Sequence, residues 1–371
     1  MTSRERLLAA IHNEKPDRLP VQVHGWMEYY LKRYLGGIDQ WQAYERFGMD
    51  TVIYTGPHET YSDTDRGNWN DESGPVTTDS DGVRHWKSVI HTPGGDLTME
   101  RASNDITTWE TEHLIKSERD FELFEKYAPV PTADWTPARE AKDRLGDRGI
   151  VRTGAHGYGQ GSPWQDLCVL MGTVPAIMCA LDDPERAHHM LDVILQKRLR
   201  RLEKANENPC DIIECGGGAG SDTVISPKLH AEFCLPYDRK QHDAIHAKDP
   251  HIRIVYHLCG GLMHMLDHVV ANGADGLETM TPPSMGGNAN IAEADQRVGD
   301  RLFFIGGFDQ QAGFEKGTPE DARKQVFELF RQKPRGGYIC CPSDHFFHGD
   351  PANIQAFVDA AKECVYEANS R

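Results

Sequence analysis

The stretch IRIVYHLCGG, residues 252–261, is followed by LMHMLDHVVA, residues 262–271, and then by ADGLET, residues 274–279. The first and third stretches contain short apolar runs that predict buried strands, and the middle one has the apolar spacing of a helix. A strand, a helix and a second strand in succession predict a parallel pair joined by a helical crossover. This unit sets the expectation for the rest of the chain.

The same alternation continues on both sides of that unit. Eight strands are predicted, and eight alternating strands favour a closed (β/α)8 TIM barrel. An open doubly wound sheet is the alternative, but no glycine-rich dinucleotide turn follows the first strand. The expected strands are Leu19–His24, Asp50–Thr55, Ile150–Ala155, Asp211–Cys215, Ile252–His257, Gly276–Thr279, Leu302–Gly306 and Gly337–Cys341. The expected helices are Arg4–His12, with Ser3 as N-cap, Pro184–Lys204, Pro227–Lys248, Leu262–Ala271, Pro319–Gln332 and Asn353–Ala368.

One region, 57–110, interrupts the alternation and is rich in Gly, Asp, Ser and Thr. Within it, Val83–Ile90 and Asp96–Arg101 flank a turn that contains two glycines, which predicts a β-hairpin excursion. We expect this region to form a lid or rim beside the barrel mouth. Because α/β barrels reach this length as one unit, we expect residues 1–371 to form a single barrel domain with 57–110 inserted in it.

The charge balance narrows the class of protein. The chain has 371 residues, with 40 Lys and Arg against 57 Asp and Glu, for a formal charge of −17. This negative charge disfavours a nucleic-acid-binding protein, because such proteins normally have a basic surface. It also disfavours docking on anionic lipid. With no apolar run of about 18 residues and no apolar signal core at its start, the chain is expected to be soluble and cytoplasmic. Its nine scattered cysteines then indicate reduced thiols, some of them metal ligands.

Candidate metal ligands follow three of the predicted strands. His257 and Cys259 are two apart at a strand end, so they face the same point. Glu278 ends the next strand. Imidazole, thiolate and carboxylate together suit Zn²⁺, and three protein ligands with one open position are typical of a catalytic zinc. A core histidine beside a buried thiol, and a salt-bridged rim glutamate, are the structural alternatives. The last strand adds further donors, namely Cys340, Cys341, Asp344 and His345.

Motifs spread along the whole chain resemble those of the uroporphyrinogen decarboxylase superfamily. The resemblance implies a (β/α)8 barrel, and a homodimer would agree with it. The matching motifs are Arg4–Ala10 with Lys15–Pro20, Ile225–Pro227 with Pro236-Tyr237, His257–Gly260, Ile305–Asp309, Gly317–Pro319 and Pro351–Asn353.

The superfamily contains at least two chemistries. In true uroporphyrinogen decarboxylases the first strand carries arginines for substrate carboxylates and an Asp follows the second strand, but 24–28 has no Arg and 54–58 has no Asp. In the zinc-dependent methyltransferases the motif His-x-Cys is followed by a distant Cys, and related barrels add a Glu. The resemblance therefore implies zinc on His257, Cys259 and Glu278, with Cys341 as the fourth ligand and Cys340, Asp344 or His345 as alternatives.

The resemblance therefore implies a zinc-dependent methyltransferase that moves a methyl group from a small methoxylated or methylated substrate to a corrinoid protein or a thiol acceptor. A separate corrinoid carrier protein is then the implied partner. The alternatives are a cofactor-independent decarboxylase acting on a substrate other than uroporphyrinogen, and a non-catalytic barrel that binds a small ligand.

The expected substrate pocket is aromatic and rich in imidazole rather than cationic. Aromatic walls suit a small methoxylated ring, although each such residue can equally be a packing residue. Glu214, His156 and His24 are the candidate acid–base groups. The candidate substrate-binding residues are Trp26, Tyr54, His58, Tyr158, Trp164 and Asp309.

Overall fold

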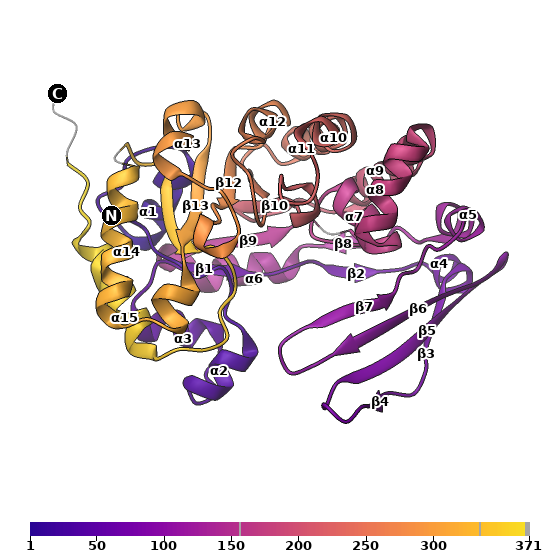
Figure 1. Ribbon diagram of the computed structural model, residues 1–371, viewed down its shortest axis with the longest axis horizontal. Helices are drawn as coiled ribbons and strands as arrows, with labels where there is room; N and C mark the ends of the chain where they lie inside the picture. Colours follow the sequence, from indigo (N-terminus) through magenta and orange to yellow (C-terminus); the bar gives the residue numbers. More distant parts are fainter. Residues whose placement is uncertain (156, 334, 368–371) are drawn as a thin grey trace.

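The computed structural model describes residues 1–155, 157–333 and 335–367, and its centre is a curled, all-parallel sheet of seven strands. Neighbouring strands follow one another in the sequence apart from the inserted region, and helices cover the outside of the sheet (Figure 1). This is the TIM-barrel-like α/β architecture that the alternation predicts. The strands are β1 (Thr51–Tyr54), β9 (Gly149–Gly154), β10 (Ile212–Gly216), β11 (Arg253–His257), β12 (Gly276–Thr279), β13 (Phe303–Phe308) and β14 (Tyr338–Pro342).

The first predicted strand, Leu19–His24, is not a regular strand. It makes a single parallel bridge, between Val21 and Cys340. The Cys340 amide donates to the Pro20 carbonyl at 3.0 Å, and the Asp50 amide donates to the Val21 carbonyl at 3.1 Å. Because Pro20 has no N–H to give, the ladder is interrupted there. The segment thus bridges the two ends of the curled sheet with a few hydrogen bonds.

The helices largely follow the expected ranges. Pro184–Lys204 and Pro319–Gln332 occur as predicted, whereas Pro227–Lys248 divides at Cys234 into two helices, and Thr2 rather than Ser3 caps the first helix. The helices are α1 (Ser3–Ile11), α2 (Glu28–Tyr34), α3 (Gln40–Phe47), α4 (Asp63–Asn68), α5 (Glu118–Tyr127), α6 (Thr136–Leu145), α7 (Pro163–Met171), α8 (Thr173–Asp182), α9 (Pro184–Lys204), α10 (Pro227–Phe233), α11 (Leu235–Lys248), α12 (Leu266–Ala271), α13 (Ile291–Val298), α14 (Pro319–Gln332) and α15 (Pro351–Glu363).

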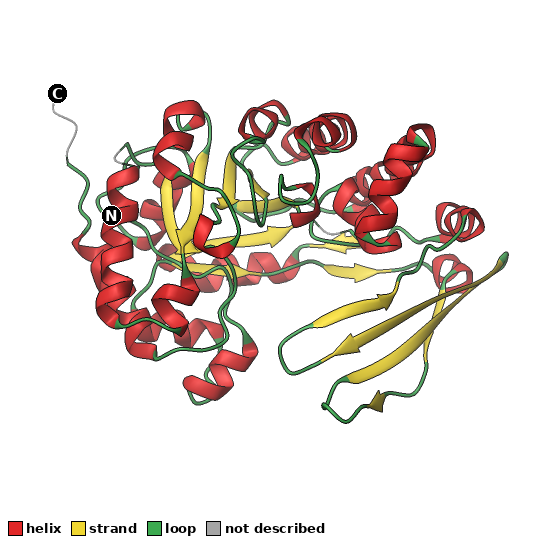
Figure 2. Ribbon diagram, viewed as in Figure 1, coloured by secondary structure: helices red, strands yellow, loops and turns green. Residues whose placement is uncertain are grey.

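The inserted region carries an antiparallel sheet that stands beside the barrel (Figure 2). Its long pair is β5 with β6, and its apolar residues Ile90, Leu97 and Met99 join a core cluster with Phe121 and Phe124 of α5. Two short strands, β2 and β8, pair between this sheet and the barrel. The strands are β2 (His58–Thr60), β3 (Asn70–Ser73), β4 (Thr77–Thr78), β5 (Arg84–Thr92), β6 (Gly95–Ser103), β7 (Thr108–Glu112) and β8 (Thr132–Asp134).

Alternate residues of the parallel strands face either the barrel interior or the helices outside. The residues that face the barrel interior form one buried apolar group, the interior cluster. Leu7, Ala10 and Ile11 of α1 belong to it, pack against strand residues such as Ile150 and Ile305, and close the barrel at the end opposite the carboxyl ends of the strands. This apolar floor leaves the carboxyl ends of the strands as the open end of the barrel.

In the described ranges no single helix is long and apolar enough to cross a membrane. The helices α7 and α8 pass that test only as a pair bent by 111°.

Candidate metal and active site

Three buried side chains meet at the carboxyl ends of adjacent strands. Glu214 lies on β10, His257 on β11 and Glu278 on β12, and His257 pairs in register with Glu278. Their potential ligand atoms all lie within 4.8 Å of one another. The parallel register explains the meeting, because strands that run side by side bring their carboxyl ends to one edge.

The two nitrogens of His257 face different partners. Nδ1 lies 2.9 Å from Glu278 Oε1, and Nε2 lies 2.8 Å from Cys259 Sγ. His257 is 1% exposed and Glu278 is fully buried, whereas Cys259 is only half-buried. A carboxylate on one ring nitrogen fixes the tautomer and the orientation of an imidazole, which leaves the other nitrogen for a ligand. The open nitrogen here faces the thiol, as the two-residue spacing predicts.

A buried guanidinium, Arg152 of β9, completes the cluster. It lies 2.6 Å from a Glu214 oxygen and 2.8 Å from Glu278 Oε2. The expectation of a pocket without a cation is therefore wrong at this position. The sequence did contain a signal for this inward-facing cation. Arg152 is the lone charge in an apolar strand, and it lies two residues from Ile150, which faces the barrel interior.

These contacts set the charge of the cluster. Burial by itself raises the pKa of Glu278, but Arg152 and His257 outweigh it and hold that pKa well below its ordinary value. Burial lowers the pKa of His257, and the neighbouring Cys259 and Glu214 outweigh it and raise that pKa well above its ordinary value. The Glu278 carboxylate is therefore ionised at neutral pH.

Two further imidazoles stand at the mouth. The ring of His24 lies 5.4 Å from the ring of His257 and 4.8 Å from that of His345, centre to centre. Burial lowers the pKa of His24 to about 4 and also lowers that of His345, so both rings are neutral at neutral pH. The Tyr54 hydroxyl donates to Glu214 at 3.2 Å. The structure thus brings His24, Tyr54 and Glu214 to the predicted metal residues.

The cysteines of the last strand lie on opposite faces. Cys341 belongs to the interior cluster and is buried, and the Gln22 amide approaches its sulfur at 3.9 Å. Cys340 packs in the outer core, so its side chain points away from the site, and Asp344 is exposed. Among the described residues, the three donors whose ligand atoms all lie within 4.8 Å of one another are Glu214, His257 and Glu278, so neither Cys341 nor Cys259 belongs to that group.

Several of the predicted substrate-binding residues have partners within the protein. Trp164 is 1% exposed and donates to the Ala219 carbonyl, so it is a core residue and not a pocket wall. Trp26 stacks on Phe47 at 5.7 Å. The carboxylate of Asp309 accepts hydrogen bonds from Ser284 and Ala312. His58 is exposed on β2, and His156 lies outside the described residues.

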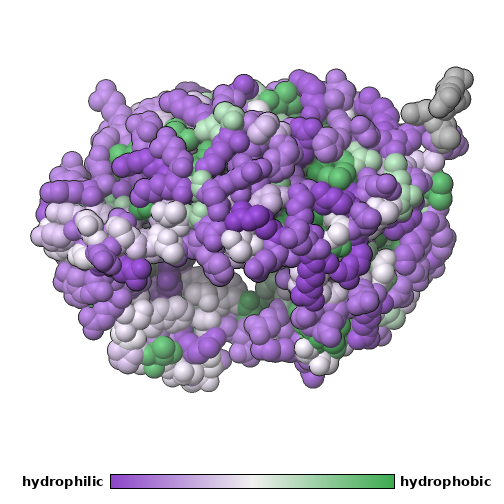
Figure 3. Space-filling model, turned by 180° about the vertical axis from the view of Figure 1, so that it is seen from behind, coloured by the Kyte–Doolittle hydropathy of each residue, from purple (hydrophilic) through white to green (hydrophobic). Residues whose placement is uncertain are grey.

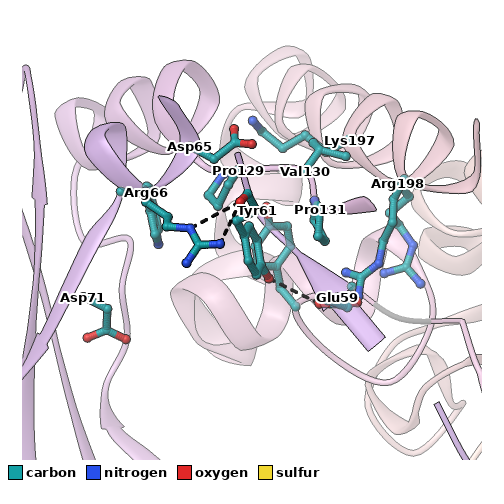
Figure 4. A pocket seen from close by; sticks show the side chains of 14 residues that line it. Glu59, Tyr61, Asp65, Arg66, Asp71, Pro129, Val130, Pro131, Lys197 and Arg198 are labelled. Atoms are coloured by element: carbon teal, nitrogen blue, oxygen red, sulfur yellow. Dashed lines mark hydrogen bonds and ion pairs between the residues drawn. The ribbon is translucent and has the colours of Figure 1, made fainter. Parts of the chain in front are cut away.

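Tyr158 lines a separate cavity of about 410 Å³ between α4, β2 and α9 (Figure 4). Most of the cationic side chains that line it already have partners. Arg201 pairs with Glu59, Arg198 pairs with Asp166, and Lys197 donates to two backbone carbonyls.

Seen from behind, the surface of the molecule is hollowed between the inserted sheet and the barrel (Figure 3).

Comparison with known proteins agrees with the motifs. The uroporphyrinogen decarboxylase (URO-D) family matches residues 111–364, more than half of the chain. The chain belongs to the uroporphyrinogen decarboxylase family. Its residues His257, Cys259 and Glu278 all lie within the matched range.

The relatives that match within this family are named either as decarboxylases or as methyltransferases. The chain is 28% identical over 189 residues to a uroporphyrinogen decarboxylase of Chlorobaculum parvum, covering 49% of this chain and 50% of that one. It is also 28% identical over 164 residues to a methylcobamide:CoM methyltransferase, MtbA, of Methanosarcina acetivorans, covering 43% and 44%. The chain thus spans about half the length of the curated relatives it matches.

Among solved structures, a methyltransferase from Methanosarcina mazei superposes with a TM-score of 0.64 at 13% identity, covering 98% of this chain and 99% of that one. At that identity the similarity concerns the fold.

Proposed function

We propose that this URO-D family member is a zinc-dependent methyltransferase that takes a methyl group from a small methylated or methoxylated substrate. One observation carries the proposal: an imidazole nitrogen and a thiol, His257 Nε2 and Cys259 Sγ, lie 2.8 Å apart at the barrel mouth. A histidine nitrogen and a cysteine sulfur are donors that suit zinc.

The donor set fits zinc on the Nε2 side of His257 better than on the Nδ1 side. On the Nδ1 side, the carboxylates of Glu214 and Glu278 are already paired with Arg152, so a second cation there would face a buried guanidinium. On the Nε2 side Cys259 is half-buried and accessible. His257 and Cys259 are the proposed ligands, and Glu278 is proposed to hold the imidazole for them. Cys341 remains the sequence-based candidate for a further ligand.

When bound, zinc supplies Lewis-acid activation of the methylated group or of a thiol acceptor. The protein's own residues supply position and protons. Glu278 fixes the His257 ring, and Arg152 keeps Glu278 ionised. His24, a neutral imidazole at the mouth, is the proposed hydrogen-bond partner of a substrate oxygen, and Glu214 is held by Tyr54. A corrinoid carrier protein that docks over the mouth is the proposed acceptor. The name of the Methanosarcina acetivorans relative also links a cobamide to methyl transfer, although there the methylcobamide is the donor and CoM the acceptor.

The test is the zinc content of the purified protein together with its zinc affinity in competition with a chelator. We expect about one zinc per chain, lost in Cys259→Ser and retained in the control Cys179→Ser, whose thiol lies on α8 away from the barrel. Glu278→Gln should weaken zinc binding by about 10- to 100-fold if Glu278 acts through His257. Wild-type protein that binds no zinc when zinc is offered would overturn the proposal and favour the decarboxylase alternative, tested by release of CO₂ from carboxylated substrates.

A further inference from the structure

The strand β11 ends at His257, and the loop that follows it, residues 258–264, carries Cys259 at the barrel mouth. His257 is fixed by its place in the sheet, whereas Cys259 is only as fixed as this loop. A metal site needs its ligands held to within about 0.5 Å, and a loop does this less well than a strand. The position of the Cys259 thiol therefore depends on what holds the loop.

Asp222, in the loop after β10, holds one side of loop 258–264. Its amide donates to the Gly261 carbonyl at 2.9 Å. Its carboxylate accepts the His264 amide at 3.3 Å and lies 2.8 Å from Nδ1 of the same residue. The neighbouring Thr223 hydroxyl accepts the Gly261 amide at 2.6 Å. The side chain of Asp222 is 8% exposed, so these contacts nearly enclose its carboxylate.

Asn288, in the loop after β12, holds the other side. Its side-chain oxygen accepts the amides of Leu262 at 2.8 Å and Met263 at 3.1 Å. Its side-chain nitrogen donates to both carboxylate oxygens of Asp222, at 3.2 and 2.9 Å. The partners require this orientation of the side-chain amide, because backbone N–H groups only donate and a carboxylate only accepts. The Asp222–Asn288 pair thus fixes three successive backbone amides of the loop.

The two glycines that follow Cys259 fit this arrangement. Gly260 has a φ of 100°, in the left-handed region that favours glycine. A Cβ at Gly261 would lie 1.4 Å from Asp222 Oδ1, so only glycine lets the backbone come this close to the carboxylate. The chain therefore turns directly after the thiol and lies against the Asp222–Asn288 pair.

We infer that Asp222 and Asn288 are positioning residues of the proposed metal site. They hold loop 258–264 between the loops after β10 and β12, and so keep the Cys259 sulfur beside His257 Nε2. The inference rests on the proposed function, in which these two atoms bind zinc. Both residues act through the loop backbone, and neither is proposed as a ligand. Supporting residues of this kind affect metal affinity without contacting the metal.

An exchange of the two side chains tests the pair directly. Asn288→Asp sets a carboxylate against the Asp222 carboxylate, which removes the donor and adds repulsion between like charges. Asp222→Asn removes the charge that the surrounding donors face. In the double variant an amide at position 222 again faces a carboxylate at position 288. Because Asn and Asp are nearly equal in size, recovery in the double variant would report the polar match and not the volume.

The first measurement is zinc affinity in competition with a chelator. Asn288→Asp is expected to lose about 10-fold or more, and Asp222→Asn less, because one side-chain oxygen still accepts. The double variant is expected to bind zinc more tightly than Asn288→Asp. The control Asp183→Asn, whose side chain caps α9 by accepting the Arg186 amide, should bind zinc like wild type. Wild-type affinity in Asn288→Asp, or no recovery in the double variant, would overturn the inference.

The second measurement needs no zinc and separates this inference from the proposed function. In protein stripped of metal, the rate at which iodoacetamide labels Cys259, followed by peptide mass spectrometry, reports how firmly the loop holds the thiol. Labelling is expected to be faster in Asn288→Asp and to slow again in the double variant. Equal labelling in all variants would overturn the inference even if wild type binds zinc. The expected pattern in a wild type that binds no zinc would overturn the proposed function alone and leave the pair as the support of Cys259.

Urea denaturation accompanies both measurements and shows which variants are folded. If Asn288→Asp does not fold, Asp222→Asn carries the test, because it is nearly isosteric and creates no contact between like charges. It is then expected to bind zinc more weakly and to label faster at Cys259 than wild type. A folded Asp222→Asn variant that matches wild type in both properties would overturn the inference.

Discussion

At the scale of single residues, the arrangement depends on one charge inside an apolar barrel. Arg152 is 1% exposed and is held by carboxylates from two other strands, Glu214 of β10 and Glu278 of β12. Two buried carboxylates without a cation would repel each other and would lose solvation that nothing replaces. Arg152 thus makes it possible for Glu278 to face His257 as an anion.

Replacing this guanidinium is expected to be costly. In Arg152→Met we expect the free energy of unfolding to fall by about 3 kcal/mol, because removing one partner of a buried ion pair leaves the other charge buried without a partner. Urea denaturation at neutral pH measures the loss. The control Arg200→Met, on the exposed side of α9, should change stability by no more than about 0.5 kcal/mol. Equal stability of the two variants would mean that the pairs around Arg152 contribute little.

At the scale of elements, the carboxylate of Asp211 contacts residues of several helices and strands. Asp211, just before β10, is 2.7 Å from Arg4 of α1 and 3.2 Å from Lys142 of α6, and it accepts the Val151 amide of β9 at 3.0 Å. Burial raises the pKa of Asp211, but these partners outweigh it and the net pKa is lowered. The floor of the barrel is therefore linked to the start of its third sheet strand by one ionised group.

The lowered pKa of Asp211 predicts a pH dependence. Since the folded pKa lies below the unfolded value of about 3.9, the contribution is fully present above that pH and is lost as pH falls below it. We expect Asp211→Asn to lower the free energy of unfolding by about 2 kcal/mol at neutral pH. The difference in the free energy of unfolding between this variant and wild type should disappear as the pH falls below about 4. Denaturation curves at several pH values measure it, with the exposed Asp147→Asn as control. A gap that did not change with pH would rule out the ionised form as its cause.

At the scale of the whole molecule, α1 closes the barrel opposite the site. Leu7 is fully buried in the interior cluster, whereas its neighbour Leu8 is only partly buried. The floor keeps water out of the end of the barrel away from the mouth, so the polar cluster of Arg152 and His257 rests on an apolar layer.

This arrangement predicts different costs for two adjacent leucines. Leu7→Ala should destabilise the fold by about 3 kcal/mol, because it removes buried methyl groups and leaves a cavity. Leu8→Ala should cost less than half of that, since part of its surface is already in water. Thermal or urea unfolding of both variants measures the difference, and equal losses would contradict the assignment of Leu7 to the interior.

The parallel strands and the pairing of His257 with Cys259 were accessible from the sequence because both depend on local periodicity. Seven of the predicted strands occur within two residues of the expected boundaries, and residues two apart at a strand end face one point. The same reasoning found Glu278, since parallel register aligns consecutive strand ends. The family motifs agreed with it.

Other features needed the tertiary structure, because they depend on which face of an element meets which neighbour. The sequence could not tell that Trp164 turns into the core, or that Cys341, on the interior face of β14, lies outside the close group of donors. It also missed that Arg152 reaches two carboxylates on other strands. Local pattern determines strands and their sides, whereas the partner of a buried charge is decided only when distant strands are brought side by side.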